Sequence, residues 1–311
     1  MTFLVGTRGS KLSLAQTNWV ISELKKKNEG SEFEIKTITT KGDTDSRALF
    51  TIDQKGIFEK EIDKAVAEKE IDFAVHSLKD VPSDIAESLT IACIPTRESS
   101  NDIIITKDGS NIKTIQSGAV IGTSSLRRAV QVSRIRQDVV VKPVRGKIET
   151  RVNKVIDGNF DAVILAEAGI SRLGLDVKHS ILSTKDFPPS PGQGALAIVC
   201  RADDEKTISM LKKIEDTKSR TEIEAERSLS EYVESGCRFP VGALATANSN
   251  TLKLTVSAYS VDGKKAITLE KTGDVDKPRD LGKNIGEELQ KTGIAEIASN
   301  WRESLEEWNK K

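Results

Sequence analysis

Short apolar segments alternate with helical patterns over the first two-thirds of the chain, and this alternation constrains the fold more than any other feature. Residues 3–6 and 71–76 are compact apolar runs of strand length. Between them, Phe58, Ile62 and Val66 recur at four-residue spacing, which indicates one face of a helix. A strand–helix rhythm of this kind favours mostly parallel sheets with helices on their faces. We therefore expect an α/β architecture here.

A second series of strands and helices begins near residue 96, which predicts a second α/β lobe. Expected strands lie at 103–106, 119–122 and 162–166, before a loop rich in proline and glycine at 187–194. A further apolar strand follows this loop directly. We expect the loop to carry the chain back to the sheet of the first lobe.

The last third of the chain has a different pattern, typical of a small α+β domain. Residues 252–258 alternate in polarity, which predicts a strand, and a helix is expected to open at Ser219 with a capping box. Two more helices are expected around 278–290 and 294–308. The predicted division is therefore a first lobe of residues 1–95 and 195–216, a second lobe of residues 96–194, and a C-terminal domain of residues 217–311.

Composition argues against several classes of protein. The 47 Lys and Arg residues balance 47 Asp and Glu residues, so bulk charge would not attract nucleic acid, and aromatic residues, at 4%, are too few for base stacking. No apolar stretch reaches the roughly 18–20 residues of a membrane span. Three scattered cysteines and two histidines speak against disulfide frameworks and metal sites. We expect a cytoplasmic monomer that binds neither nucleic acid, membrane nor metal.

Several arginines lie near turns that contain Gly, Ser or Thr, or near the starts of helices. Helix N-termini present unpaired N–H groups, and the planar guanidinium fork matches carboxylates and phosphates. Each arginine taken alone fits a solvated surface residue better, but the repeated turns on two lobes together favour an anion-binding cleft. The arginines concerned are Arg8, Arg127, Arg128, Arg145, Arg151 and Arg172.

One apolar strand runs directly into the polar segment His76-Ser77-Leu78-Lys79-Asp80-Val81-Pro82. Ligand crevices of open α/β sheets lie outside the carboxyl ends of their strands. Lys79 and Asp80 are therefore candidate site residues. The alternative is that Asp80 caps a turn between a strand and a helix.

Cys237 differs from the other two cysteines in its surroundings. It follows a predicted helix and lies between Gly236 and Arg238, and a thiol beside a cation in a turn tends to be exposed and partly ionised. Cys93 and Cys200 lie in apolar strands, where a thiol is buried and inert. A buried packing role for Cys237 remains the alternative.

Taken together, these segments resemble the porphobilinogen deaminase family over nearly the whole chain. The H-S-x-K-D-x-P and G-T-S-S-L-R-R strings are the most specific. The segments that carry the resemblance are Gly6-Thr7-Arg8-Gly9-Ser10, Lys41-Gly42-Asp43, Lys55-Gly56-Ile57-Phe58, Ala74-Val75 with the polar segment after it, Gly122-Thr123-Ser124-Ser125-Leu126-Arg127-Arg128, Arg145-Gly146-Lys147 with Thr150-Arg151, Pro191-Gly192-Gln193-Gly194, and Gly236-Cys237.

The resemblance implies two α/β lobes like those of bacterial solute-binding proteins, with a small C-terminal α+β domain. It implies a transferase of porphyrin and heme biosynthesis that joins four porphobilinogen molecules head to tail, with loss of ammonia, and releases hydroxymethylbilane. The polypyrrole would grow on a dipyrromethane cofactor, which a thioether attaches to Cys237.

The resemblance also implies roles for individual residues. Asp80 and Lys79 would be catalytic and contact the cofactor, because an ionised carboxylate beside the pyrrole nitrogens stabilises the cation formed when ammonia leaves. Cofactor binding is implied for Cys237, Thr123, Ser124, Ser125, Arg127 and Arg128, and substrate binding for Arg8, Ser10, Lys55, Arg145, Arg151 and Arg172.

Two other functions compete with this one. A two-lobed binding or sensor module would hold a polycarboxylate without turnover and would need neither Asp80 nor Cys237. A cysteine acyl transferase would need a histidine partner, and neither His76 nor His179 lies near a cysteine in the sequence.

Overall fold

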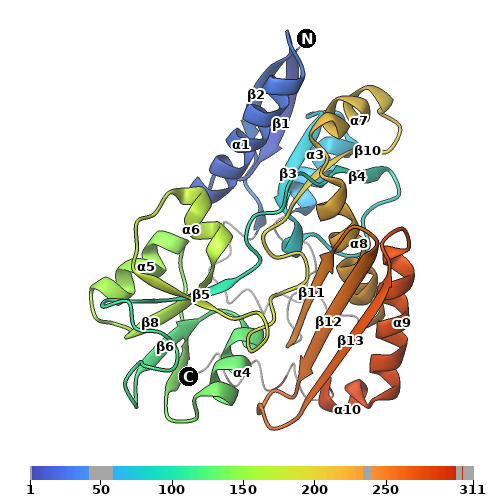
Figure 1. The fold of residues 1–311 in the computed structure, drawn as a ribbon. Coiled ribbons are helices and arrows are strands. Elements are labelled where there is room, and N and C mark those ends of the chain that lie inside the picture. Colours follow the sequence, from blue (N-terminus) through green and yellow to red (C-terminus); the bar gives the residue numbers. More distant parts are fainter. Residues whose placement is uncertain (1, 42–58, 234–239, 299–302, 304–311) are drawn as a thin grey trace. The chain divides into compact units, whose positions relative to one another are not determined.

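The computed structural model describes residues 2–41, 59–233, 240–298 and 303 (Figure 1). These residues form two compact units, one of residues 1–98 and 194–223 and one of residues 99–193 and 224–311. The first unit holds one five-stranded sheet, and the second holds another five-stranded sheet and a three-stranded sheet. The expected fold class, two α/β lobes and a small α+β region, is confirmed. The three-part division of the chain stays a prediction.

The first sheet has helices on both faces. Successive side chains of its central strand point to opposite faces. Phe73 and Val75 pack with Leu24 of helix α1, whereas Ala74 packs with Ile62 of helix α3. The strands in sheet order are β2 (Glu32–Thr37), β1 (Thr2–Thr7), β3 (Phe73–Ser77), β10 (Leu196–Arg201) and β4 (Leu89–Cys93), and the helices are α1 (Lys11–Lys27), α3 (Lys60–Ala67) and α7 (Glu205–Leu211).

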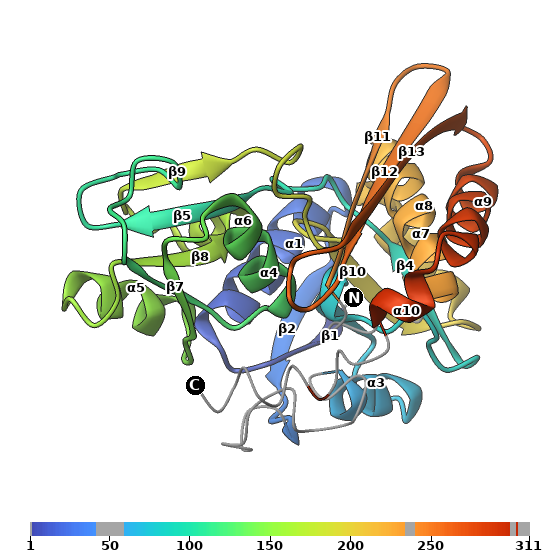
Figure 2. The same ribbon diagram turned by 90° about the horizontal axis from the view of Figure 1, so that it is seen from below.

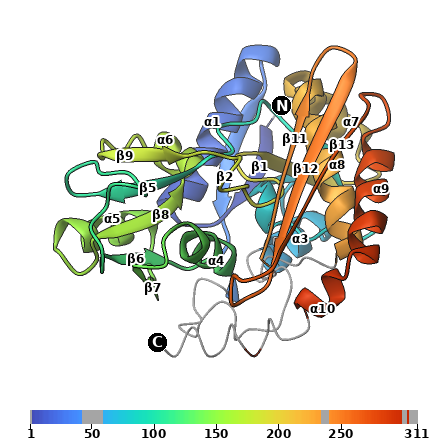
Figure 3. The ribbon, with the colours of Figure 1, turned by 60° about the horizontal axis from the view of Figure 1, so that its bottom comes forward.

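The second sheet repeats this plan (Figure 3). Ile164 faces Val132 of helix α4, and its neighbour Val163 faces Val152 of helix α5 on the other side. In each sheet three parallel strands are followed by one antiparallel strand. The strands are β7 (Val140–Pro143), β6 (Val120–Thr123), β8 (Ala162–Ala166), β5 (Asp102–Thr106) and β9 (His179–Leu182), and the helices are α4 (Leu126–Ile135), α5 (Ile148–Ile156) and α6 (Glu167–Leu173).

The third sheet is an antiparallel meander covered on one face by helices α8 and α9 (Figure 2). Its core contains Leu254 and Val256 from the sheet, Leu229 from α8, and Ile285 and Leu289 from α9. The strands are β11 (Val241–Ala247), β12 (Thr251–Tyr259) and β13 (Ala266–Asp274), and the helices are α8 (Thr217–Val233), α9 (Pro278–Lys291) and α10 (Ile294–Ala298).

Helix α8 begins at Thr217, and its capping residue lies three residues before the Ser219 that the sequence predicts. The carboxylate of Asp216 accepts a hydrogen bond from the N–H of Ser219 at 2.7 Å, which is the bond expected of a capping residue. Ser219 therefore lies inside the first turn, and the predicted capping box is wrong. The helix also joins two cores, because Ile223 packs in the first unit and Ala225 in the core of the third sheet.

None of the described helices combines the length and apolar character that crossing a membrane requires.

Candidate functional site

In the first sheet, the predicted site residues follow the carboxyl ends of two neighbouring parallel strands. Strands β1 and β3 run parallel, so the segments after them leave the sheet at the same edge. Arg8 and Ser10 follow β1, whereas Lys79 and Asp80 follow β3. This edge is where ligands bind in open α/β sheets. The fold therefore brings these four residues to one end of the first unit.

The second sheet gathers its predicted residues in the same way. Strand β6 runs parallel to both β7 and β8. The turn at 123–125 follows β6, Arg145 follows β7, and Arg172 lies in helix α6 directly after β8. Asp102, the first residue of antiparallel β5, lies opposite Ala166 at the end of β8. A buried acid thus joins the arginines at this edge.

Asp80 ends a short 3₁₀ turn that immediately follows β3. The N–H of Leu78 donates to the carbonyl of Ala195 at 3.0 Å, and the N–H of Val81 donates to the carbonyl of Leu78 at 3.0 Å. The backbone on both sides of Lys79 and Asp80 is therefore anchored, and both side chains are half-buried. The fold therefore holds the backbone of this pair in place at the carboxyl end of β3.

His76 and Ser10 shape the backbone around this edge. The Nε2 atom of His76 lies 3.0 Å from the carboxylate of Asp63, which ties the end of β3 to helix α3. Ser10 caps helix α1, since its hydroxyl oxygen accepts a hydrogen bond from the N–H of Ser13. Arg8 lies two residues before this cap and is half-buried.

The hydroxyl groups of the turn after β6 hold its backbone. The Oγ1 atom of Thr123 accepts from the N–H of Ser125 at 3.1 Å, and Ser125 caps helix α4. The hydroxyl group of Ser124 donates to the carbonyl of Val144. The glycine before the turn is required as well, because a Cβ atom at Gly122 would lie 2.9 Å from the ring of Phe160.

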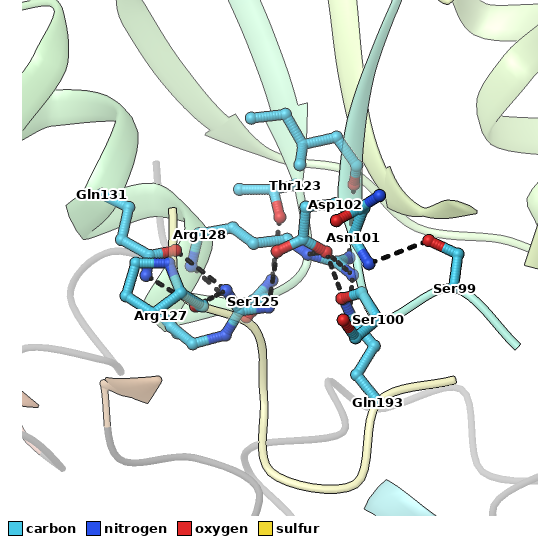
Figure 4. A network of polar contacts seen from close by, with 12 residues as sticks. Ser99, Ser100, Asn101, Asp102, Thr123, Ser125, Arg127, Arg128, Gln131 and Gln193 are labelled. Carbon is cyan, nitrogen blue, oxygen red and sulfur yellow. Dashed lines mark hydrogen bonds and ion pairs between the residues drawn. The ribbon is translucent and has the colours of Figure 1, made fainter. Parts of the chain in front are cut away.

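Two buried arginines from the first turn of α4 converge on Asp102 (Figure 4). Nη2 of Arg127 lies 2.8 Å from one carboxylate oxygen of Asp102, and Nη2 of Arg128 lies 2.7 Å from the other. Arg127 also donates to the carbonyl of Pro188 at 2.7 Å and to Gln131 at 2.9 Å. Asp102 is fully buried, and the two arginines are 5% and 7% exposed.

The charges of this cluster determine the ionisation of Asp102. Burial alone would raise the pKa of this carboxyl group, but the charges of Arg127 and Arg128 and the hydrogen bonds of Arg128 and Gln193 outweigh burial, so its pKa falls to about 2. Asp102 is therefore ionised at neutral pH. The cluster of two guanidinium groups and one carboxylate carries one net positive charge.

Arg151 supplies a further cation beside this cluster. Burial and the nearby charge of Arg128 lower the pKa of Arg151 to about 10. Within the described part of the chain, its guanidinium group makes one hydrogen bond, to the carbonyl of Gly146 at 2.8 Å, and no ion pair. A carboxylate that bound here would stabilise the charged form of Arg151 through a charge-assisted hydrogen bond. Of the other predicted arginines, Arg145 is exposed and Arg172 is half-buried.

The Pro-Gly-Gln-Gly segment is fixed by the same cluster. The side chain of Gln193 is fully buried, accepts from Arg128 at 3.2 Å, and donates to Asp102 at 2.9 Å and to the carbonyl of Ser100 at 2.8 Å. Gly192 has a positive φ of 75°, which glycine adopts readily. The loop is therefore held from inside by its own glutamine.

Two of the predicted residues, Lys55 and Cys237, lie outside the described residues. The other two cysteines are free and fully buried. Burial raises the pKa of the Cys93 thiol and raises that of Cys200 to about 12. Both stay protonated and inaccessible, as the sequence predicts.

Sequence reasoning missed two buried acids that organise the second unit. Asp102 is the first residue of the isoleucine-rich strand β5, and an acid within so apolar a segment is the signal that it needs a buried partner. Glu226 is fully buried in helix α8 and accepts from the N–H groups of Gly192 at 2.6 Å and Ala245 at 2.9 Å. Glu226 thus holds the Gln193 loop and the edge strand β11 together.

Comparisons with known proteins point to one family. Residues 3–209 match the family model described as "Porphobilinogen deaminase, dipyromethane cofactor binding domain", and residues 220–291 match "Porphobilinogen deaminase, C-terminal domain". The chain is 66% identical over 310 residues to the probable porphobilinogen deaminase of Nitrosopumilus maritimus, covering 100% of both chains. It is 43% identical over 296 residues to the porphobilinogen deaminase of Brevibacillus brevis, covering 94% of this chain and 95% of that one.

Proposed function

Because the chain belongs to the porphobilinogen deaminase family, we propose that the residues at its two sheet edges bind and polymerise porphobilinogen. Its activity is that of a porphobilinogen deaminase (EC 2.5.1.61) in porphyrin biosynthesis, and its first 209 residues include a dipyrromethane-binding domain. This assignment sets aside a non-catalytic binding module and an acyl transferase. In the proposed reaction, four porphobilinogen molecules are joined head to tail with loss of ammonia at each step, and water then cleaves the tetrapyrrole from the cofactor to release hydroxymethylbilane.

The observation that carries the site proposal is the surplus of half-buried and buried positive charge in the second unit. Arg127 and Arg128 share one acid, Asp102, and Arg151 adds a third positive charge near Arg128, where burial and that charge lower its pKa. Every pyrrole of the substrate and of the cofactor carries an acetate and a propionate. Carboxylates of this kind would neutralise the surplus charge, so the residues present fit the cofactor.

We assign the cofactor's carboxylates to Arg127, Arg128 and the turn at 123–125. When bound, the cofactor supplies the pyrrole carbon to which the first substrate is added. We assign its covalent attachment to Cys237, because the other two thiols are unsuitable. Cys93 and Cys200 are fully buried and their pKa values are raised, so neither offers an accessible thiolate.

We assign the catalytic role to Asp80, with Lys79 beside it. The amino group of the substrate's aminomethyl substituent leaves as ammonia, and positive charge then develops on the pyrrole and the methylene carbon that it keeps. An ionised carboxylate about 4 Å away, at an effective dielectric constant of about 20, attracts that charge by about 4 kcal/mol. This attraction corresponds to roughly a thousandfold in rate. The anchored backbone around Asp80 is what keeps the carboxylate in place during repeated additions.

The remaining predicted residues are assigned to the incoming substrate and the growing polypyrrole. These residues are Arg8, Ser10, Lys55, Arg145, Arg151 and Arg172. We also propose that the enzyme is cytoplasmic and monomeric. The free cysteines at positions 93 and 200 suit a reducing compartment.

Intact mass spectrometry of the purified protein tests this proposal. We expect a mass above that of the sequence by one dipyrromethane, together with a pink product with Ehrlich's aldehyde. Incubation with porphobilinogen should then give hydroxymethylbilane and ammonia. An unmodified chain that gains no mass from porphobilinogen would refute the covalent cofactor and the assignment of Cys237.

A further inference from the structure

We propose that Asp102 is a positioning residue for this reaction, which orients the guanidinium groups of Arg127 and Arg128 and cancels one of their two charges. This inference rests on the proposed role of Arg127 and Arg128 in binding the cofactor's carboxylates. No sequence motif singles out Asp102, and its side chain is fully buried, so it acts through the arginines rather than on a ligand.

The geometry around Asp102 fixes both arginines in direction as well as in place. Arg128 directs Nε and Nη2 to one carboxylate oxygen of Asp102, at 3.0 and 2.7 Å, and Nη1 to the carbonyl of Ile164 at 3.3 Å. Arg127 is held between Asp102 and the carbonyl of Pro188. A guanidinium group has five N–H donors in a rigid fork, so several fixed bonds determine where the remaining edge points.

The charge balance gives the acid its second role. Two adjacent guanidinium groups that are nearly buried would repel each other and turn outward if no anion lay between them. Asp102 supplies that anion permanently, so the pair is already arranged before a ligand carboxylate arrives. Prearranged donors avoid reorganisation when the ligand binds, and small displacements of such donors are costly to rate.

Gln193 completes the arrangement. Its amide donates to Asp102 at 2.9 Å and its carbonyl accepts from Arg128 at 3.2 Å, so it bridges the acid and one of its arginines. Because Gln193 is uncharged, replacing it disturbs the orientation of the pair without leaving a buried charge unpaired. This property provides a second, milder test of the same inference.

The test measures turnover per cofactor-loaded molecule, with the loaded fraction taken from intact mass. For the Asp102→Asn holoenzyme we expect kcat to fall at least tenfold while KM for porphobilinogen changes less than about threefold, since the displaced arginines serve the cofactor. A purely structural role would lower the amount of folded protein and leave kcat per holoenzyme unchanged. The control is Asp108→Asn, an exposed acid that bonds only within its own turn, with wild-type values expected.

A second readout does not depend on activity. If Asp102 balances charge, removing one arginine should relieve the defect, so the double variant Asp102→Asn/Arg127→Gln should have a higher thermal midpoint than Asp102→Asn alone. Equal or lower midpoints would contradict the charge-balancing role. If Asp102→Asn gives no holoenzyme, Gln193→Met is measured, with at least a threefold loss of kcat expected.

Failure of this inference can be told apart from failure of the proposed site. A wild-type kcat per holoenzyme in Asp102→Asn, or in Gln193→Met where that variant is needed, overturns the positioning role of Asp102. Normal cofactor loading in both Arg127→Leu and Arg128→Leu instead overturns the assignment of those arginines.

Discussion

Arg128 donates two hydrogen bonds to a single carboxylate oxygen of Asp102, from Nε at 3.0 Å and from Nη2 at 2.7 Å. With the ion pair from Arg127, this contact lowers the pKa of Asp102 to about 2 despite complete burial. The charge balance of this buried cluster therefore depends on one acid. This dependence makes its response to pH a direct test of the structure.

The Asp102 carboxylate should stabilise the fold near neutral pH and cease to do so in acid. Because its pKa is lower in the folded chain than the ordinary value of 3.8, the stabilisation is present above about pH 4 and is lost as the pH falls towards 2. It amounts to about 2 kcal/mol. Urea unfolding should show Asp102→Asn well below the wild type at pH 7 and a smaller gap at pH 3. A gap that is independent of pH would show that Asp102 is not ionised.

Replacing Asp80 should nearly abolish turnover. The Asp80→Asn side chain keeps its shape but loses the charge that would stabilise the cation, so kcat per holoenzyme should fall roughly a thousandfold. The matched control is Asp84→Asn, an exposed acid four residues further along, which should keep wild-type kcat. Formation of the Ehrlich-positive product measures both. An Asp80→Asn enzyme that keeps most of its activity would remove Asp80 from the central role.

Arginines at the two parts of the site should fail in different ways. Arg127→Leu or Arg128→Leu should lower the fraction of molecules that retain the cofactor, whereas Arg172→Leu should load normally and stall during elongation. Intact mass distinguishes the two failures, because a stalled enzyme accumulates species heavier than the holoenzyme by whole pyrrole units. Normal loading and elongation in all three variants would contradict these assignments.

Arg151 should matter more for activity than for stability. Its charge is disfavoured by burial and by Arg128, so Arg151→Gln should leave the urea midpoint unchanged or slightly higher. The loss of a charged hydrogen bond to the substrate should lower kcat/KM about tenfold or more. Arg136→Gln should behave in the opposite way, because Arg136 bonds Asp138 at 2.7 Å and two carbonyls in the same unit. The reverse pattern would make Arg151 a structural residue.

Only one of the three cysteines should be needed for the cofactor. Cys237→Ser should be purified without a covalent adduct, and porphobilinogen should add no stable mass to it. Cys200→Ala should keep the adduct, because burial holds the Cys200 thiol protonated with a pKa of about 12. An adduct that survives in Cys237→Ser would move the attachment point elsewhere.

Sequence patterns predicted the elements because periodicity reports which face of an element is buried. Helix α9 begins at the predicted residue 278 and ends at 291, and both α/β sheets carry the expected strands. The predicted cap of α8 failed for a physical reason. Ser219 and Asp216 both suit a capping position, but the Ser219 hydroxyl accepts from the N–H of Arg97, far away in sequence, and Asp216 accepts from the N–H of Ser219.

The site was only partly predictable, for a related reason. A motif identifies residues whose chemistry is local to one segment, such as the turn at 123–125 or the Lys79-Asp80 pair. Asp102 acquires its role from arginines that enter from another element, and Glu226 from backbone N–H groups more than ten residues away on either side. Partners this distant in sequence are brought together only by the fold, so a local sequence motif does not identify them.

Helix α8 has a consequence for how genes of this kind can recombine. Ile223 and Ala225 belong to different cores, and Glu226 fastens both a loop and an edge strand from the same stretch of helix. A crossover within residues 217–233 would join two parts of helix α8 that come from different parent proteins. The side chains of each part would then have to pack against cores that are not both from its own parent. Chimaeras of distant relatives should therefore survive when the crossover avoids this interval, even though the change from α/β to α+β character suggests it as a natural seam.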